Sequence, residues 1–314
     1  MQFFHETVTI VLPVFLVIGL GAFLRRIRLI DVNFIHQTNR LVYLIFLPAL
    51  LFYKIAKADF FSYFNAPLVV GSSLAIGLMF CLSYAYGHLR GYRPASLGSF
   101  SQGSFRGNLA YIGLAICLNA YGEVGLTRAS ILMGFLVPVL NFFAIIALIR
   151  PQRHLNPEGP KKNWWREILL NPLILSSFAG IFWSFYQLPV PVILDRSLAI
   201  IAGITLPLAL LAIGGGFSLQ RLKGDLKSAG IATFFKLALL PLIALPLLLL
   251  GKVQGMDLSI GLLLAGTPAA TATYIMAHQL KADAELAGSI VMLSTLASAF
   301  SYTLLLLLLR HNGL

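Results

Sequence analysis

The sequence contains few charged residues for its length. Of 314 residues only 11% are charged, less than half of the roughly 25% found in average proteins, while 58% are hydrophobic and the mean hydropathy is +0.86. A soluble chain of this size would need more charged surface, so the surplus of apolar side chains must face lipid. The low charge therefore excludes an ordinary soluble domain and predicts a membrane-embedded helical bundle.

Cysteine is scarce, and the common catalytic motifs are missing. Cys81 and Cys117 both lie inside apolar stretches and form neither a disulfide framework nor a metal-ligand spacing, so we interpret them as small buried hydrophobic residues. The sequence also lacks a His-Glu-x-x-His motif, a Walker loop, a paired Cys-x-x-Cys and a Gly-x-Ser-x-Gly elbow. These absences predict no enzyme, no metal, no cofactor and no ATP-driven pump.

Acidic residues are half as frequent as basic ones, with 11 Asp and Glu against 23 Lys and Arg and a formal net charge of +12. The basic residues gather in short clusters between apolar runs, which favours membrane loops over a nucleic-acid surface. Fourteen fall in loops on one side of the predicted bundle and six on the side of the termini. This bias predicts a multi-pass inner (plasma) membrane protein with both termini extracytoplasmic.

Ten apolar stretches are long enough to cross a bilayer, for which a helix needs about 20 residues. The first has no basic segment before it and is followed by Arg25, Arg26 and Arg28, which predicts a retained span and not a cleaved signal peptide. We number the stretches spans 1 to 10, at roughly residues 7–26, 34–55, 66–88, 97–120, 127–149, 168–188, 195–218, 228–250, 258–279 and 285–309.

Two pairs of matching segments indicate an internal repeat. Pro48 in span 2 and Pro207 in span 7 lie in similar Leu-rich segments, and Asn108 in span 4 and Pro268 in span 9 mark polar or Pro-containing breaks. The interval between the two prolines is only one position shorter than the interval between the two breaks. Because each copy would hold five spans, the second copy must enter the membrane from the opposite face, as in many secondary transporters. The alternative is a chance match between Leu- and Pro-rich helices.

The predicted fold is an all-α membrane protein of ten transmembrane helices, arranged as two inverted five-helix repeats with broken, crossing helices 4 and 9. The basic, Pro-containing segment near mid-chain reads as a linker between the halves. We therefore predict a first repeat at 1–149, a cytoplasmic linker at 150–167 and a second repeat at 168–314.

Span 4 is too polar to face lipid. Unpaired polar groups in hydrocarbon cost several kcal/mol each, so this part of the span must face protein or water. We assign Arg106 to electrostatic attraction of an anion, Asn108 to hydrogen bonding, and Gly103 and Gly107 to close approach of another backbone. Gln102 completes the candidate substrate-binding residues of this span.

Span 9 is interrupted by Pro268, which lacks a backbone donor and clashes with the preceding turn. The ends of half-helices favour bound ions, and their N-termini favour anions. Substrate-binding candidates here are Thr267, Thr271, Thr273 and Tyr274. The alternatives are that Pro268 only kinks the helix and that the threonines bond their own helix.

Away from the ends of the predicted spans there are three basic residues and no acidic residue. Arg106 is the first candidate for anion sensing, whereas Arg40 could simply extend to the membrane surface and Lys236 could pair with backbone carbonyls. His278 could titrate in a proton-coupled cycle or be an interfacial polar residue. Without carboxylates, the core is poorly suited to binding bare cations, and Arg40, Lys236 and His278 remain candidates for a coupling or charge role.

Four segments resemble the auxin efflux carrier family, which includes plant PIN-type carriers and bacterial organic-acid carriers. They cover nearly the whole chain, and the Arg-Gly-Asn and Pro-x-x-x-x-x-Tyr portions are moderately specific. The segments run from Thr38 to Leu50, from Arg106 to Leu114, from Pro207 to Gly215 and from Thr267 to Ala277.

The resemblance implies a scaffold from spans 1, 2, 6 and 7, often dimeric, and a transport domain from spans 3–5 and 8–10. It also implies that spans 4 and 9 unwind where they cross, near the substrate carboxylate, with Asn108 touching substrate and Pro268 as the crossover proline. Plant members have a proline where this chain has Gly107, and long plant members have a central hydrophilic loop that this chain lacks.

The sequence therefore predicts an elevator-type secondary transporter or facilitator of a small organic anion, such as a carboxylate, an auxin-like acid or a dicarboxylic acid. The expected partners are this anion, the lipid bilayer and a second copy of the chain. A membrane sensor built on a transporter fold and an intramembrane enzyme are the alternatives. The substrate, the direction of transport, proton or sodium coupling and the oligomeric state are left open.

Overall fold

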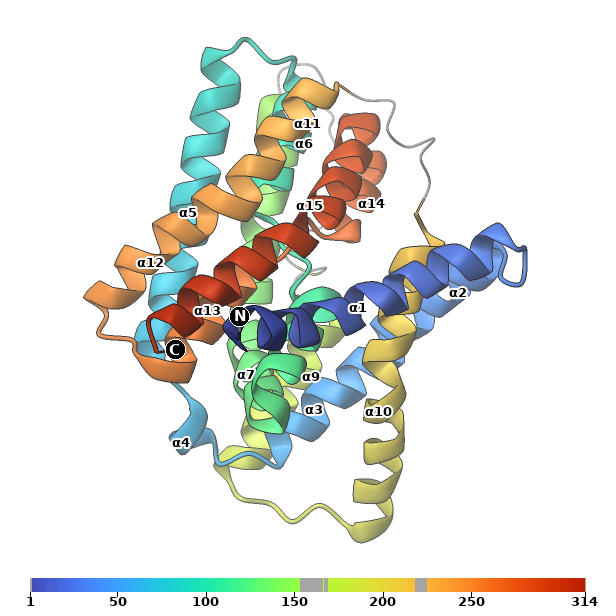
Figure 1. Cartoon of the computed structure of the whole chain (residues 1–314), viewed down its shortest axis with the longest axis vertical. Helices are drawn as coiled ribbons and strands as arrows, with labels where there is room; N and C mark the ends of the chain where they lie inside the picture. The colour runs from blue at the N-terminus through green and yellow to red at the C-terminus, as the bar shows by residue number, and fades with distance from the viewer. Residues whose placement is uncertain (1, 153–165, 167–168, 218–224, 314) are drawn as a thin grey trace. The chain divides into compact units, whose positions relative to one another are not determined.

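The computed structural model describes residues 2–152, 166, 169–217 and 225–313. Within these ranges every regular element is a helix, and the one extended pairing is an isolated antiparallel bridge between Gly107 and Ala269. The predicted all-α class is therefore confirmed for the described residues (Figure 1). The predicted linker falls mostly on residues outside these ranges.

Seven helical segments in the described part of the chain are long and apolar enough to cross a membrane. Two shorter apolar helices, Pro172–Phe185 and Gly255–Ala265, accompany them. The chain is therefore a multi-pass membrane protein, while the count of ten spans and their inverted arrangement stay predictions. The seven segments are His5–Arg26, Val32–Ala56, Ala66–Leu89, Leu109–Gln152, Val192–Gly215, Leu226–Leu250 and Ala284–His311.

The end of predicted span 4 and the start of predicted span 5 are two helices that follow each other directly within α7 (Leu114–Ile149) and meet at Gly122, whose backbone is not helical. Gly122 has φ 61° and ψ −153°, a conformation open almost only to glycine. The connection that the sequence suggests between residues 120 and 127 is therefore as short as one residue of positive φ, Gly122.

The chain divides into two compact units. Unit 1 comprises Met1–Ala66, Ala110–Val137 and Glu167–Phe217, and unit 2 comprises Pro67–Leu109, Pro138–Arg166 and Ser218–Leu314. The helices of unit 1 are α1 (Gln2–Arg26), α2 (Val32–Leu41), η1 (Val42–Phe46), α3 (Leu47–Ala56), α4 (Phe60–Tyr63), α9 (Pro172–Phe185), α10 (Val192–Gly215) and the first part of α7.

Unit 2 holds both of the helices that end at the Gly107–Ala269 bridge. Its elements are α5 (Ala66–Leu89), α6 (Pro94–Phe105), the last part of α7, η3 (Arg150–Gln152), α11 (Leu226–Phe234), η5 (Phe235–Leu239), α12 (Leu240–Leu250), α13 (Gly255–Ala265), α14 (Thr271–Gln279) and α15 (Ala284–His311). The π-helical turn η2 (Leu109–Gly113) follows the bridge segment and leads into α7.

Close helix pairs hold unit 1 together at glycines. An added Cβ on Gly21 of α1 would lie 2.1 Å from the Leu211 carbonyl oxygen of α10, and one on Gly180 of α9 would lie 3.2 Å from the Phe52 carbonyl oxygen of α3. Gly21 and Gly180 are separated in the sequence by the same interval as Phe52 and Leu211. This is also the interval that separates Pro48 from Pro207, so two helix contacts recur at the spacing of the predicted repeat.

A third contact in unit 1 joins residues at the same spacing. The Thr205 hydroxyl of α10 lies 3.2 Å from the Phe46 carbonyl oxygen at the end of η1 and 2.8 Å from the Ile201 carbonyl of its own helix. At the membrane surface, Asp195 lies 2.7 Å from the Lys57 ammonium and raises the pKa of Lys57. The pair joins the end of α3 to the first turn of α10.

Wider π-helical turns precede two prolines in the spans. In η1, the turn ends two residues before Pro48, and in η5 it ends two residues before Pro241. A proline inside a helix lacks a donor and collides with the carbonyl of the turn before it. A π turn provides the extra room, and such turns recur at functional sites. The two spans therefore continue past their prolines without breaking.

Candidate functional site

The two interrupted spans of unit 2 meet through their backbones. The Asn108 amide donates to the Pro268 carbonyl at 2.7 Å, and the Ala270 amide donates to the Arg106 carbonyl at 3.0 Å. These bonds flank the Gly107–Ala269 bridge, so we call residues 106–108 and 267–270 the crossing. Backbone that leaves a helix inside a bilayer needs new partners, and each segment supplies them to the other.

Both helices end just before the crossing. α6 ends at Phe105 with Arg106 as its C-cap residue, and α13 ends at Ala265. On the far side, α14 starts at Thr271 and no side chain caps its N-terminus. Because the first N–H groups of a helix have no partner within it, the start of α14 provides donors and the positive end of a helix dipole. The crossing thus combines helix ends of both signs.

Gly107 is where the two segments come closest. An added Cβ would lie 2.1 Å from the Thr267 Oγ1 and 3.2 Å from the Lys236 Cε. No side chain other than hydrogen fits there without moving its neighbours. The Thr267 hydroxyl donates to the Leu264 carbonyl at 2.8 Å, so this threonine bonds its own helix while it packs against Gly107.

The polar side chains at the crossing differ in burial and in bonding partner. Arg106 is half-buried and donates from Nη2 to the Asn141 Oδ1 of α7 at 2.8 Å. Asn108 is buried, with 7% of its surface exposed. Lys236, from the π-helical turn η5, is 0% exposed, and its Nζ lies 2.5 Å from the Ala265 carbonyl oxygen. Unit 2 thus brings two basic side chains to the crossing.

A buried polar seam between α6 and α14 adjoins the crossing. The Gln102 Nε2 contacts the Met276 Sδ at 3.5 Å, and the Gln102 Oε1 and the Thr273 Oγ1 are buried with no hydrogen-bond partner in the described part of the chain. Gly103 lies inside intact α6, where it packs against Ile290 of α15. The neighbours of Gly103 are therefore side-chain atoms of Ile290, and α6 ends two residues later at Phe105.

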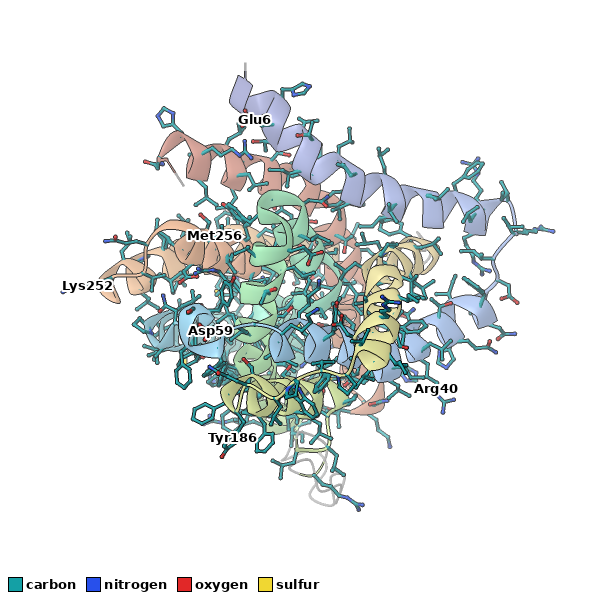
Figure 2. All side chains as sticks on the ribbon, turned by 90° about the horizontal axis from the view of Figure 1, so that it is seen from below. Glu6, Arg40, Asp59, Tyr186, Lys252 and Met256 are labelled. Atoms are coloured by element: carbon teal, nitrogen blue, oxygen red, sulfur yellow. The ribbon has the colours of Figure 1, made fainter. Side chains whose placement is uncertain are left out.

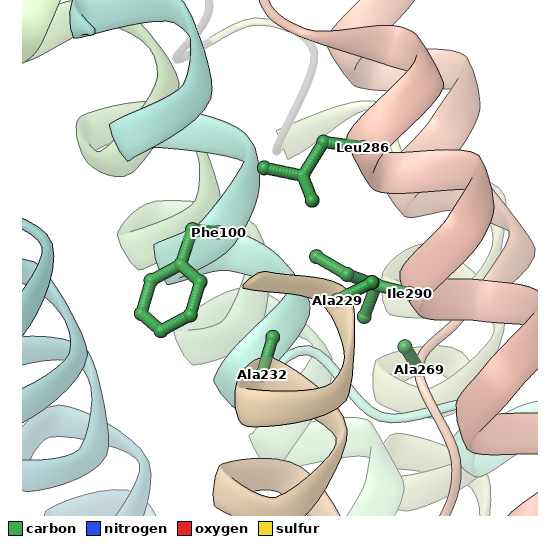
Figure 3. Close-up of a cluster of buried hydrophobic side chains, with 6 residues drawn as sticks. All are labelled: Phe100, Ala229, Ala232, Ala269, Leu286 and Ile290. Carbon is green, nitrogen blue, oxygen red and sulfur yellow. The ribbon is translucent and has the colours of Figure 1, made fainter. Parts of the chain in front are cut away.

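An apolar cluster of residues from α6, α11 and α15 packs against the second segment of the crossing. Figure 3 shows Phe100 of α6, Ala229 and Ala232 of α11, Leu286 and Ile290 of α15, and Ala269 of the crossing. All six side chains are at most 2% exposed. The cluster includes a crossing residue, so core packing as well as the two backbone bonds hold the second segment in place.

The other predicted site residues lie further along or in unit 1. Thr271 and Tyr274 are half-buried in the first turns of α14, while His278 is exposed at its end, with its ring 6.4 Å from that of Tyr274. Arg40 is exposed in the last turn of α2 (Figure 2). Pro48 and Pro207 belong to unit 1 with Arg40.

Neither Pro48 nor Pro207 ends its span. Pro48 is the second residue of α3, directly after the π turn η1, and Pro207 lies within continuous α10. Of the predicted residues, the structure therefore brings together Arg106, Gly107, Asn108, Thr267, Pro268 and Lys236.

Three residues that the sequence reading missed complete the crossing. Asn141 accepts the Arg106 hydrogen bond, Ser294 accepts from the Ala269 amide at 3.0 Å, and Tyr302 donates to the Leu263 carbonyl of α13 at 3.2 Å. Asn141 and Tyr302 are polar residues well inside predicted spans, which is a usable signal. Ser294 gave no comparable signal, because serine is common in membrane helices and usually bonds its own helix.

Comparison with known proteins gives a consistent result along the whole chain. The profile of the family described as "Membrane transport protein" matches residues 7–306, which include both units and every residue of the crossing. A protein of Rhizobium meliloti (strain 1021) named "Putative malonate transporter" is 28% identical over 313 residues, which cover 98% of each chain.

Two archaeal proteins show similarity of nearly the same extent. An uncharacterised transporter of Methanocaldococcus jannaschii is 23% identical over 295 residues, covering 91% of this chain and 93% of its own. Another from Methanothermobacter thermautotrophicus is 22% identical over 305 residues, covering 97% and 98%. The similarity therefore extends over most of the chain in each case and is not confined to one unit.

Proposed function

The chain belongs to the membrane transport protein family, which includes the auxin efflux carriers, and on that premise we propose that it is a secondary carrier or facilitator of a small organic anion. The pair of backbone hydrogen bonds at the crossing carries the proposal. Two interrupted spans that meet in this way expose helix ends and unwound backbone, the usual components of a transporter substrate site.

The charges of unit 2 favour an anion as the solute. Arg106 and Lys236 bring basic groups to the crossing, and the start of α14 adds the positive end of a helix dipole. In unit 1, by contrast, Lys54 pairs with Glu123 and Lys57 pairs with Asp195. Malonate, named for the relative from Rhizobium meliloti, is a small dicarboxylate and a suitable first probe.

We further propose that the fold is an inverted repeat and that transport follows an elevator mechanism. Support for the repeat comes from unit 1, where the Gly21–Leu211 and Gly180–Phe52 contacts repeat each other at the Pro48–Pro207 interval and the Thr205–Phe46 bond joins two residues that are one such interval apart. Unit 1, with spans 1, 2, 6 and 7, would be the scaffold and dimer interface. Unit 2, with the crossing, would be the transport domain, although residues 110–137 of spans 4 and 5 fall in unit 1.

The proposal also covers the membrane in which the carrier resides and the side on which its termini lie. We propose that the carrier resides in the inner membrane with both termini extracytoplasmic, because the basic residues concentrate in the loops opposite the termini.

Transport by purified protein in liposomes tests the proposed function. Wild-type protein should take up labelled malonate, or a related mono- or dicarboxylate, faster than empty liposomes do. Asn108→Ala should reduce this uptake by about tenfold or more, because a hydrogen bond to a charged group contributes about 1.5–3 kcal/mol. Asn33→Ala, at an exposed position of α2, is the matched control and should transport normally.

Thermal unfolding of each variant separates a lost site from a lost fold. Asn108→Ala should unfold near the wild-type temperature. Unchanged uptake by Asn108→Ala would remove this residue from the site, and a wild-type protein that moves none of the carboxylates would refute the proposed anion carrier.

A further inference from the structure

Lys236 is a buried basic residue that lies next to the first segment of the crossing and bonds the end of α13. Its ammonium lies 2.5 Å from the Ala265 carbonyl oxygen, where α13 ends, and its Cε lies next to Gly107 in the first segment. The side chain comes from a third span, through the π-helical turn η5. Lys236 is therefore placed to act on both interrupted helices at once.

The backbone explains why a side-chain donor is needed at Ala265. In an unbroken helix this carbonyl would accept from the Ala269 amide, but that amide donates to Ser294 instead. The two preceding carbonyls of α13, those of Leu263 and Leu264, also accept from side chains. Their donors are neutral hydroxyls: Tyr302 donates to Leu263 and Thr267 donates to Leu264. Capping alone thus accounts for a donor at Ala265, but not for a charged one.

A buried ammonium is expensive, so a purely structural role is a poor explanation for lysine here. Moving a charge into a bilayer costs at least about 2.5 kcal/mol even on the most favourable scales. The C-terminus of α13 offsets part of this, since a helix end carries roughly half an elementary charge. Within the described residues, Lys236 forms no ion pair, and one acceptor is assigned to a group with three N–H donors.

The other half of the crossing uses a basic residue in an equivalent way. α6 ends with Arg106 as its C-cap residue, and the guanidinium of Arg106 donates to Asn141 of α7, so a basic residue follows the negative end of that helix. The interval that relates Asn108 to Pro268 also relates Arg106 to Gly266, which has no charge and caps α13. Lys236 supplies from η5 the charge that the second segment lacks.

We propose that Lys236 is a specificity-determining residue of the carrier, the cation that turns the carbonyl end of α13 into an anion-binding surface and contacts the carboxylate of the solute. This inference rests on the proposed function. Carbonyl oxygens at the end of a helix repel an anion, whereas an ammonium bound to them attracts it through its remaining donors. Without the charge, the crossing keeps its fold and loses most of its affinity for carboxylates.

Two substitutions separate the cap from the charge. Lys236→Gln keeps a neutral donor near the Ala265 carbonyl, and Lys236→Met keeps only the apolar length. We expect Lys236→Gln to unfold close to the wild-type temperature, while its KM for labelled malonate in liposomes rises at least tenfold. Lys227→Gln, at an exposed position in the first turn of α11, is the control and should keep the wild-type KM.

A wild-type measurement complements the variants in case they fail to fold. Exposed lysine ammonium protons exchange rapidly with water, so a buried ammonium should dominate the observable side-chain signals of ¹⁵N-lysine-labelled protein. Malonate should shift that signal, and neutral malonamide should not. If malonate does not shift the signal, Lys236 does not contact the solute.

The outcomes distinguish this inference from the function on which it rests. If wild-type protein moves no carboxylate, the proposed function fails whatever the variants do. If wild-type protein moves malonate and Lys236→Gln does so with an unchanged KM, Lys236 is only a helix cap and the inference is overturned.

Discussion

At the scale of single residues, the crossing depends on the absence of a side chain at Gly107. The Thr267 hydroxyl and the Lys236 methylene chain occupy the space that a Cβ would need, at 2.1 Å and 3.2 Å. In this chain, close packing decides the residue type.

Gly107→Ala should destabilise the protein by about 1–3 kcal/mol, the usual cost of forcing an extra group into a packed core. The threonine side chain must move, and with it the bond to Leu264 that helps to end α13. We expect a lower unfolding temperature in detergent and reduced malonate uptake. Gly230→Ala, where a Cβ would meet nothing within 4 Å, is the control and should be neutral or slightly stabilising.

A second substitution tests whether the clash is the cause. Thr267→Ala removes the atom that the new Cβ would meet, so Gly107→Ala in that background should cost less than it does alone. Equal losses in both backgrounds would show that the strain arises elsewhere.

At the scale of helices, small residues decide which helices pair. Gly21 lets α1 approach α10, and Gly180 lets α9 approach α3. In lipid no hydrophobic effect drives helices together, so close packing at small residues provides much of the association energy. The two contacts recur at one spacing in the chain, as the proposed repeat requires.

Substitutions at these glycines should rank by the space available. Gly21→Ala places a Cβ 2.1 Å from a rigid carbonyl oxygen, and Gly180→Ala places one 3.0 Å from the Ile55 Cβ. We expect the first to lower the unfolding temperature most, the second less, and Gly19→Ala, with nothing within 4 Å, to leave it unchanged. An equal effect of Gly19→Ala and Gly21→Ala would contradict the assigned contact.

At the scale of the whole molecule, the separation into two units is the feature with mechanistic meaning. The crossing and both of its basic side chains lie within unit 2, while the α1–α10 and α3–α9 pairs that meet at Gly21 and Gly180 lie within unit 1. A carrier that moves one unit as a body needs the substrate site to be complete within that unit. The composition of unit 2 meets this requirement for the residues described.

Accessibility of introduced cysteines tests the orientation of the whole chain. In a background without Cys81 and Cys117, Asn312→Cys near the C-terminus should react with a membrane-impermeant maleimide added to intact cells. Leu29→Cys, in the loop after α1, should react only after the inner membrane is opened. Both positions are exposed. The reverse pattern would place the termini in the cytoplasm and contradict the positive-inside prediction.

The amino-acid sequence by itself determined the class of this protein and the places where its spans are interrupted. Hydropathy marks apolar helices because lipid accepts no unpaired polar groups, and the polar run before Asn108 and the proline at 268 break two helices for local reasons. The equal spacing of matching residues in the two halves, such as Pro48 and Pro207, can also be read from the sequence alone. Hydrogen bonds between distant residues cannot, because the segments that they join share no sequence pattern.

The tertiary structure alone decided how the broken backbones are satisfied. The Asn108 amide bonds the Pro268 carbonyl in the other half of the chain, and the Ser294 hydroxyl accepts from the Ala269 amide. Lys236, from another span, donates to the Ala265 carbonyl. In the sequence, Lys236 could equally have been a cap or a charge. Its position near the ends of α13 and α6 depends on how η5 packs against these helices. Hydrogen bonds form between groups that are close in space, whatever their separation in the chain.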